Sequence, residues 1–369
     1  MNETTDAATP PSSARRFDAE ALERFATALL TRAGLAAPLA ETTARTLVEG
    51  DLMGHDTHGL ALLAPYVKEL EEGSMARSGL PRVLSDRGAS MLWDGMRLPG
   101  PWLVCRGVDA LAPRAREYGS ATLVIRRSHH IACLATYLLR ATEAGFLLLL
   151  ASSDPAVRSV APHGGTKAVF TPNPIAAGIP TTTTPFLVDI SSSSTTNGMC
   201  GRMKTAGKSF DEPWMLDADG HESRDPGVLS ADPPGTILPL GGMSAGHKGF
   251  GLALIVEALT GGLAGHGRAD PGDGWGATVY MTLHDPAAFA GAPDFTRQMD
   301  WIGTACRDNA PRPGAGAVRM PGDRSLALRH AQLRDGIRLH ETIPPLLQAC
   351  GRRYGLELPI PVPAEQQRA

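Results

Sequence analysis

The sequence lacks an excess of charge of either sign. Its 35 Lys and Arg residues nearly balance its 38 Asp and Glu residues, which leaves a formal net charge of -3. A protein with this balance has no basic field that would attract a nucleic-acid backbone or an anionic membrane surface. We therefore expect neither nucleic acid nor membrane among its partners.

Long apolar runs are also absent. The longest run, residues 145–151, is far shorter than the roughly 20 residues that a membrane-spanning helix needs. The first 16 residues are polar and lack the apolar centre of a secretory signal peptide. We predict that residues 1–16 form a disordered leader and that the protein is cytoplasmic.

Cysteine is scarce and scattered. An odd number of distant cysteines without a Cys-x-x-Cys pair argues against a disulfide framework and against a structural zinc site. His55 and His58, with His129, His130 and Asp189, offer an alternative set of metal ligands, but no His-Glu-x-x-His motif accompanies them. We expect no metal. The five cysteines are Cys105, Cys133, Cys200, Cys306 and Cys350.

The two commonest nucleotide-binding sequences are missing. There is no Gly-x-Gly-x-x-Gly between a strand and a helix, and no Walker A sequence. Instead, His247, Lys248 and Gly249 open a predicted apolar helix over 248–263. A lysine and free backbone N–H groups at a helix start would form an anion site. The alternative is a charged first turn on an exposed helix end.

The spacing of apolar residues predicts helices at both ends of the chain. Residues 17–49 are predicted to form two helices and 60–72 a third, while 333–354 return to helical spacing and would pack on the first helices. From Gly79 onward, short β-prone runs alternate with helices. In this part we predict strands at 121–125, 146–152, 168–170, 186–190 and 277–283, a helix at 131–144 and a loop at 209–234.

A chain of 369 residues is long for one core and predicts two domains. After the leader, we expect the first part of a helical domain over 17–78 and an α/β domain over 79–319. Residues 320–369 would return to the helical domain and form the tail. The fold class is therefore α/β.

One histidine is especially suited to catalysis. His58 lies in the run Gly54-His55-Asp56-Thr57-His58-Gly59, between two predicted helices. The following glycine leaves little bulk beside the imidazole, so a small substrate can come within hydrogen-bond reach, as a general acid requires. Histidine also titrates near neutral pH. We therefore predict that His58 exchanges a proton with a substrate.

Other polar residues stand at predicted strand ends, where α/β proteins usually bind ligands. His130 follows one strand, and His163 and His247 stand beside small residues; together they indicate one cleft, although each alone fits a structural role. Asp189 ends the predicted strand 186–190. A carboxylate there would orient a histidine or raise its pKa by charge attraction. Alternatively, Asp189 caps the next turn.

Several motifs follow one another in a fixed order. The first motif is the run Asp51-Leu52-Met53-Gly54-His55-Asp56-Thr57-His58-Gly59, and the second is His130-Ile131-Ala132. Two motifs of small residues come next, Ala-Pro-His-Gly-Gly at 161–165 and Asp-Ile-Ser-Ser-Ser at 189–193. The last three are Trp-Met-Leu-Asp-Ala-Asp-Gly at 214–220, Leu-Pro-Leu-Gly-Gly at 238–242 and His-Lys-Gly-Phe-Gly-Leu at 247–252. Together they resemble the non-Rossmann malate/L-lactate dehydrogenases, whose members include ureidoglycolate dehydrogenase, sulfolactate dehydrogenase and piperideine-2-carboxylate reductase. The resemblance runs from about Phe17 to Leu356.

The resemblance implies a dimeric oxidoreductase that uses NAD or NADP. Its α/β fold would combine a non-Rossmann nucleotide-binding mixed sheet with a helical domain built from both chain ends. Hydride would pass to or from the C=O or C=N carbon of a small 2-oxo or 2-hydroxy acid or imino acid. His58 would exchange the proton, aided by Thr57 and Asp189, and His130 would line the cofactor cleft or share the proton work. The other cofactor-binding residues would be Ser153, Asn173, Ser191, Ser193, His247, Lys248 and Gly249.

Four positions depart from the family pattern. Leu62 replaces an arginine suited to bidentate binding of a substrate carboxylate, and Met53 replaces a second arginine. Pro172 removes a hydroxyl and a backbone donor beside the cofactor, and Met199 replaces a lysine. The changes at Leu62 and Met53 make the expected pocket less basic. We therefore expect a substrate whose carboxylate is masked, absent or bound elsewhere.

The departures also support an alternative from another functional class. A lyase or isomerase on the same scaffold would use His58, His130 and Asp189 as plain acid and base. Its cofactor site would be degraded, as Pro172 and Met199 suggest.

Overall fold

The two ends of the chain belong to one unit, and the middle of the chain forms a second. The computed structural model describes residues 15–272 and 274–363. Residues up to Glu71 and from Ser325 onward form the first unit, and Glu72–Arg324 form the second. A helical unit built from both chain ends is thereby confirmed. Residues 1–14 of the predicted leader (1–16) lie outside the described residues.

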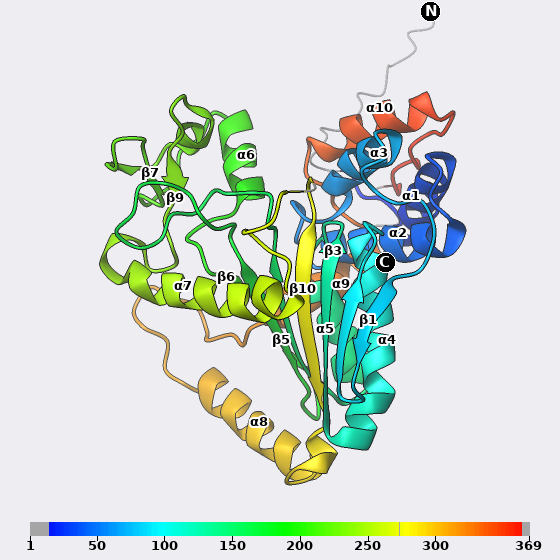
Figure 1. Cartoon of the computed structure of the whole chain (residues 1–369), viewed down its shortest axis with the longest axis vertical. Helices are drawn as coiled ribbons and strands as arrows, with labels where there is room; N and C mark the ends of the chain where they lie inside the picture. The colour runs from blue at the N-terminus through cyan, green and yellow to red at the C-terminus, as the bar shows by residue number, and fades with distance from the viewer. Residues whose placement is uncertain (1–14, 273, 364–369) are drawn as a thin grey trace, which may run out of the picture. The chain divides into compact units, whose positions relative to one another are not determined.

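The first unit is helical because its apolar residues recur every three or four positions. In α1, for example, Leu22, Phe25 and Leu29 are buried, and the Asp18 carboxylate caps the helix by accepting a 2.8 Å hydrogen bond from Ala21 N–H. The elements of this unit, labelled in Figure 1, are α1 (Ala19–Arg32), α2 (Ala37–Leu52), the 3₁₀ turn η2 (Leu60–Leu62), α3 (Leu63–Glu71), α9 (Asp323–Asp335) and α10 (Ile343–Arg353).

Backbone hydrogen bonds tie the two chain ends together in this unit. Phe17 and Ile337 donate to each other's carbonyl oxygens over 2.9 and 2.7 Å. As predicted, the tail packs on the first helices, since α10 contacts α3. The helical spacing predicted over 333–354 corresponds to the end of α9 and to α10, which are separated because Gly336 has a φ of +89° just after α9 and α10 begins only at Ile343.

The second unit is built on a mixed sheet of seven strands. Their order is β1-β2-β3-β10-β4-β5-β6, and the β2–β3 pair, connected through α4 (Gly100–Tyr118), is parallel while the other neighbours are antiparallel. This confirms a mixed, non-Rossmann sheet. The strands are β1 (Arg82–Asp86), β2 (Ser90–Asp94), β3 (Ser120–Ser128), β4 (Leu147–Ser153), β5 (Pro174–Ile179), β6 (Phe186–Ser191) and β10 (Ala277–His284).

Helices cover both faces of this sheet (Figure 1). On one face, α4 packs so tightly that a Cβ on Gly107 would be 2.7 Å from Met281 Sδ, and α5 (Ala135–Glu143) packs against Gly178. On the other face lie α7 (Gly242–Glu257) and its π-helical continuation η4 (Ala258–Gly262). The Ser153 hydroxyl at the end of β4 donates a hydrogen bond to Glu257 at the end of α7. Because side chains alternate along a strand, Met281 of β10 faces α4, and the residues on either side of it in the strand face the side that carries η4.

A smaller antiparallel sheet forms a separate core within the second unit. Its order is β8-β7-β9, and its apolar cluster includes Val160, Phe170, Met215 and Ile237. The predicted strand 168–170 is wrong, because only an isolated bridge joins Phe170 to Val160. The predicted loop 209–234 contains short regular pieces. Within 209–234 these are β7 (Met215–Leu216), β8 (Glu222–Ser223) and the 3₁₀ turn η3 (Pro226–Ser230), while α6 (Asn197–Thr205) precedes the segment and β9 (Thr236–Ile237) follows it.

Two predicted helices begin elsewhere than expected. The helix predicted over 131–144 starts at Ala135, because Ala132 adopts a φ of +56° that an α-helix cannot contain. The helix predicted over 248–263 starts upstream at Gly242 and changes to π-helix after Glu257.

The helix α8 (Ala292–Arg307) extends beyond the sheet at the lower end of Figure 1, after the short 3₁₀ turn η5 (Pro286–Ala288). Within α8, which is described throughout, Gly303 is the buried residue, and Trp301 is 69% exposed. Among the described helices of the chain, no segment has both the length and the apolar character needed to cross a membrane.

Candidate active site

The turn that carries His58 connects α2 to η2. Gly54, with a φ of +81°, opens the turn. Backbone hydrogen bonds of 2.8 Å from His55 N–H to Gly50 O and from His58 N–H to His55 O close it. The Thr57 hydroxyl lies 2.8 Å from His58 Nδ1. The structure thus brings Thr57 and His58 together, and their hydrogen bond restrains the imidazole ring.

A buried carboxylate supports this turn from inside. Asp51 is 3% exposed, and its Oδ2 accepts a 2.6 Å hydrogen bond from Leu60 N–H. The backbone passes so close that a Cβ on Gly59 would be 2.4 Å from the same oxygen. Gln332 on α9 donates to the carbonyls of Asp51 and Leu52 over 2.9 and 3.0 Å. The sequence gives no local signal for Gln332, because these partners are 281 and 280 residues away.

One edge of the large sheet collects the predicted site residues of the second unit. β3, β4 and β6 end at this edge, whereas β10 and β5 run antiparallel to their neighbours and begin there. His130 therefore follows β3, Ser153 ends β4, Asn173 precedes β5 and Ser191 ends β6, all at one edge. The strand order brings together residues that are dispersed in the sequence.

At this edge His130 stacks on a tryptophan that the sequence analysis missed. The rings of His130 and Trp275 lie 4.6 Å apart with an interplanar angle of 28°, and buried His129 meets the edge of Trp275 at 5.2 Å. A Cβ on Gly100 would be 2.3 Å from His130 O, so the start of α4 packs directly on this backbone. Trp275 lies two residues before the start of β10, and His130 lies two residues after the end of β3. Because β10 and β3 are antiparallel neighbours, the two residues meet at the same edge of the sheet.

Asp189 is not the last residue of its strand, so that prediction is wrong: β6 continues to Ser191. Its Oδ2 accepts a 3.0 Å hydrogen bond from Ala135 N–H at the start of α5, where a negative charge is favourable, and lies 3.8 Å from Cys133 Sγ. Burial, together with the Asp189 charge, raises the pKa of the Cys133 thiol well above its ordinary value. Asp189 therefore caps a helix that precedes it in sequence. Its support of His58 stays a prediction.

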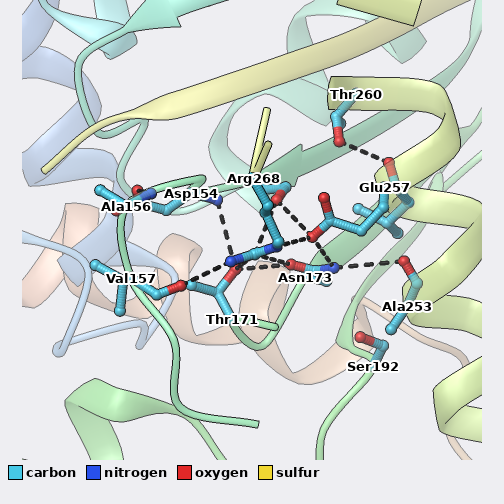
Figure 2. A network of polar contacts seen from close by, with 12 residues as sticks. Asp154, Ala156, Val157, Thr171, Asn173, Ser192, Ala253, Glu257, Thr260 and Arg268 are labelled. Atoms are coloured by element: carbon cyan, nitrogen blue, oxygen red, sulfur yellow. Dashed lines mark hydrogen bonds and ion pairs between the residues drawn. The ribbon is translucent and has the colours of Figure 1, made fainter. Parts of the chain in front are cut away.

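A polar network joins Ser153 and Asn173 to the end of α7. Figure 2 shows this network around Asn173, Glu257 and Arg268. Glu257 Oε1 accepts hydrogen bonds from Ser153 Oγ at 2.9 Å, Asn173 Nδ2 at 2.8 Å and Arg268 Nε at 2.6 Å. Thr171 Oγ1 donates to Asn173 Oδ1 over 2.7 Å. Glu257 and Arg268 were missed because they come from separate segments and belong to none of the motifs found in the sequence, whereas Thr171 belongs to the Thr-Pro-Asn-Pro run of 171–174 that was compared with the family.

The end of β6 is attached to the same region. The backbone N–H and the hydroxyl of Ser192 both donate to Pro172 O over 2.9 Å. The Ser191 hydroxyl donates to Ser193 O over 3.0 Å, and the Ser193 hydroxyl donates to Thr195 O over 2.6 Å. Ser193 is 2% exposed, so its hydroxyl shapes the strand end. The predicted cofactor contacts of Ser191 and Ser193 stay predictions.

The residues His247, Lys248 and Gly249 do not open α7, so the helix-start argument for an anion site there is wrong. The helix begins at Gly242, which places all three within its second and third turns. His247 and Lys248 are exposed. A Cβ on Gly249 would be 2.7 Å from Ser192 O, so α7 packs against the end of β6. Their cofactor role stays a prediction that rests on the Lys248 charge.

The departures from the family pattern have different surroundings. Leu62 is half-buried in η2, and its N–H donates to Gly59 O over 3.0 Å, directly after the His58 turn. Met53 is 2% exposed and belongs to the core of the helical unit. Its effect on the basicity of a substrate pocket stays a prediction. Met199 is 36% exposed in the first turn of α6.

Comparison with known proteins agrees with this arrangement. A family model described as malate/L-lactate dehydrogenase matches residues 17–347. This protein belongs to the malate/L-lactate dehydrogenase family. It is 29% identical over 330 residues to an L-lactate dehydrogenase from Cupriavidus necator, covering 88% of this chain and 93% of that protein. It is 30% identical over 339 residues to a (2R)-3-sulfolactate dehydrogenase (NADP(+)) from Chromohalobacter salexigens, covering 89% of this chain and 95% of that protein.

A solved structure extends the comparison to a reductase. The crystal structure of delta1-piperideine-2-carboxylate reductase from Pseudomonas syringae matches with a TM-score of 0.76 and 25% identity, covering 91% of this chain and 99% of that one. Members of the family are thus dehydrogenases and reductases. This protein is an enzyme of the same class, and a redox role takes precedence over the lyase or isomerase alternative.

Proposed function

We propose that this enzyme transfers hydride between NAD or NADP and the C=O or C=N carbon of a small acid. The substrate is a 2-oxo or 2-hydroxy acid, an imino acid or a relative with a masked carboxylate. The observation that carries the proposal is the Thr57–His58 hydrogen bond of 2.8 Å, which restrains a half-buried imidazole between two glycines, Gly54 and Gly59. A restrained imidazole of this kind suits proton exchange with a small substrate.

The residues at the sheet edge fit a nicotinamide dinucleotide in their chemistry. Such a cofactor presents an aromatic ring, an amide, ribose hydroxyls and a pyrophosphate. The edge offers the hydroxyls of Ser153 and Ser191 and the stacked rings of His130 and Trp275, and α7 adds the exposed cation of Lys248. When bound, the cofactor would supply or accept the hydride.

We assign the proton exchange to His58. In the reductive direction the substrate carbon gains a hydride with its two electrons, the π bond breaks, and the oxygen or nitrogen takes a proton from His58. Thr57 occupies Nδ1, so Nε2 is the nitrogen assigned to the substrate. We propose that Asp189 stabilises the resulting charge and that His130 lines the cofactor cleft or shares the proton work.

The substrate preference follows from Leu62. An arginine at this position would place a planar cationic fork beside the His58 turn, whereas leucine offers an apolar surface. A free carboxylate has no bidentate partner from this residue. The proposed substrate therefore has its carboxylate masked, absent or held by another group.

We also propose that the enzyme is a homodimer in the cytoplasm. α8 leaves Trp301 69% exposed, and nearby Phe289 is 68% exposed beside a cavity of about 640 Å³ lined by Leu147 and Phe295. Exposed apolar surface of this extent is typical of an interface between subunits. The five cysteines, all within the described residues, form no disulfide with one another, which suits a reducing compartment.

Kinetic assays test the proposal. NADH and NADPH oxidation should be followed with a panel of 2-oxo acids, cyclic imines and amide-masked analogues, and calorimetry should detect binding of at least one cofactor. Light scattering should give the mass of a dimer, and Trp301→Glu should shift it toward the monomer. Absence of binding by both cofactors would refute the redox function.

A further inference from the structure

An ion pair at the centre of the Figure 2 network belongs to none of the family motifs found in the sequence. Arg268 lies in the loop between η4 and β10, and Glu257 is the last residue of α7. Their side chains are 13% and 18% exposed, and Arg268 Nε donates to Glu257 Oε1 over 2.6 Å. The pair is thus largely withdrawn from water at the edge where Ser153 ends β4.

The guanidinium of Arg268 connects three other segments. Its Nη1 donates to Val157 O over 2.8 Å. Its Nη2 lies 3.2 Å from both Ser153 Oγ and Thr171 Oγ1 and 3.5 Å from Asn173 Oδ1. Only a planar, forked cation reaches partners in these directions at once, and a lysine ammonium cannot replace it.

These contacts determine what Ser153 can offer a ligand. A serine hydroxyl has one hydrogen to donate and two lone pairs that accept. The Ser153 hydrogen is committed to Glu257 Oε1 at 2.9 Å, and one lone pair receives Arg268 Nη2 at 3.2 Å. One lone pair remains on a residue that is only 2% exposed, so Ser153 can receive at most one N–H or O–H donor at the protein surface and cannot donate to a ligand.

Asn173 has a different role from the one expected for it. Its Nδ2 donates to Glu257 Oε1 at 2.8 Å and to Ala253 O at 3.4 Å, while its Oδ1 accepts from Thr171 at 2.7 Å and from Arg268 at 3.5 Å. The residue is fully buried and has a φ of +44°. A strained backbone persists where its surroundings hold it in place. The amide of Asn173 therefore fixes its own turn.

We propose that Arg268 and Glu257 are positioning residues for cofactor binding. The pair fixes the Ser153 hydroxyl as an acceptor for an amide or ribose donor of the cofactor, and it fixes the strained Asn173 turn that leads into β5. This inference rests on the proposed function, because it names how one part of that same site is held.

The test compares cofactor affinity with stability in three variants. Arg268→Lys keeps the charge and loses the fork. Arg268→Met combined with Glu257→Gln removes both charges and leaves an acceptor for Ser153, which avoids an unpaired buried charge. Arg114→Lys is the matched control, because Arg114 forms a comparable forked pair with Asp86 at β1, with distances of 2.6 and 2.7 Å.

We expect Arg268→Lys and the double variant to raise the Kd for NADH or NADPH by about tenfold, the effect of one or two lost hydrogen bonds. Arg114→Lys should leave the Kd unchanged. Cofactor-free Arg268→Lys should still unfold in one cooperative transition, at a melting temperature below that of the control, because it also loses the contacts that hold the Asn173 turn, and the Arg114–Asp86 pair is more exposed. The Ser153→Ala substitution should weaken binding in the wild type and have little further effect in Arg268→Lys, because the two residues act through one hydroxyl.

Each other outcome has a defined meaning. If wild type binds a cofactor and the Arg268 variants bind it equally well, the positioning role is wrong and the proposed function stands. Additive effects of Ser153→Ala and Arg268→Lys would also overturn the inference. If wild type binds neither NADH nor NADPH, the proposed function fails and the inference fails with it.

Discussion

The His58 turn and the Arg268 network are both organised by a carboxylate, but over very different distances along the chain. Asp51 Oδ2 accepts from Leu60 N–H, nine residues away. Glu257 Oε1 accepts from Ser153 and Asn173, 104 and 84 residues away. The turn is largely specified by one continuous motif, whereas the network exists only when β4, β5 and α7 are all in place.

This difference separates two kinds of function. A short turn holds His58, the group proposed to exchange a proton, so changes there should alter the chemical step. A long-range network holds the groups proposed to meet the cofactor, so changes there should alter binding. The four expectations below test this separation, in order of decreasing effect.

The largest effect is expected from His58→Ala. Removal of the general acid should lower kcat by about 10²–10⁴-fold, the usual contribution of acid–base catalysis, while the Kd for the cofactor changes little. Stopped-flow and steady-state assays would measure both. The exposed His221 provides the control, since His221→Ala should keep wild-type kcat. A near-normal kcat in His58→Ala would transfer the proton exchange to another group, with His130 the first alternative.

A second effect should appear in stability. In Gly59→Ala the new Cβ would lie 2.4 Å from Asp51 Oδ2, so the turn must shift. We expect a loss of about 1–3 kcal/mol in the free energy of unfolding, together with lower kcat and unchanged cofactor affinity. Gly201→Ala is the control, because no atom lies within 4 Å of its Cβ position. Equal unfolding curves for the two variants would show that Asp51 does not support the turn.

A smaller change concerns substrate choice. Leu62→Arg should raise kcat/KM for simple 2-oxo acids by about tenfold, the value of a charge-assisted hydrogen bond to a carboxylate. Leu62→Met, of similar volume and without charge, should leave the substrate ranking unchanged. If both variants keep the wild-type ranking, Leu62 is not the residue that excludes free carboxylates.

The smallest effect is a pH dependence at Cys133. Burial and the Asp189 charge raise the pKa of this thiol in the folded protein, whereas in the unfolded chain it ionises near pH 8.5. Stability is therefore unaffected by this thiol below about pH 8.5 and falls as the pH rises from there toward the raised pKa of the folded state, because the unfolded chain then ionises while the folded thiol stays protonated. At pH 8, iodoacetamide should label the half-buried Cys306 well before Cys133. Mass spectrometry of labelled peptides would show a contradiction if Cys133 reacted first.

The contrast between local and distant contacts also explains which parts could be predicted from the sequence. β3, β4, β6 and β10 are continuous β-prone runs, and the structure confirms all four. α4 escaped prediction because Pro113 stands inside the helix and Pro101 near its start. The late start of α5 depends on Ala132, whose φ of +56° is unusual for alanine and has no signal in the sequence.

The same limit applies to the candidate site. Thr57 and His58 are neighbours, so their hydrogen bond could be inferred from the motif around them. Gln332 and Arg268 could not be inferred, because each meets partners that only the completed fold brings near. A single sequence shows which residues are chemically able to act, but the residues that hold them become visible only with the strand order.

The position of β10 has a consequence for the newly synthesised protein. This strand is the last of the sheet in the chain, yet it lies between β3 and β4, which were made more than a hundred residues earlier. During translation the sheet stays split until residues 277–284 leave the ribosome, and pairing over such separations is slow. Trp275 and Arg268 arrive immediately ahead of that strand. A nascent chain truncated before β10 would therefore lack the assembled edge at which we propose that the cofactor binds, and we expect it to gain binding only once the sheet is closed.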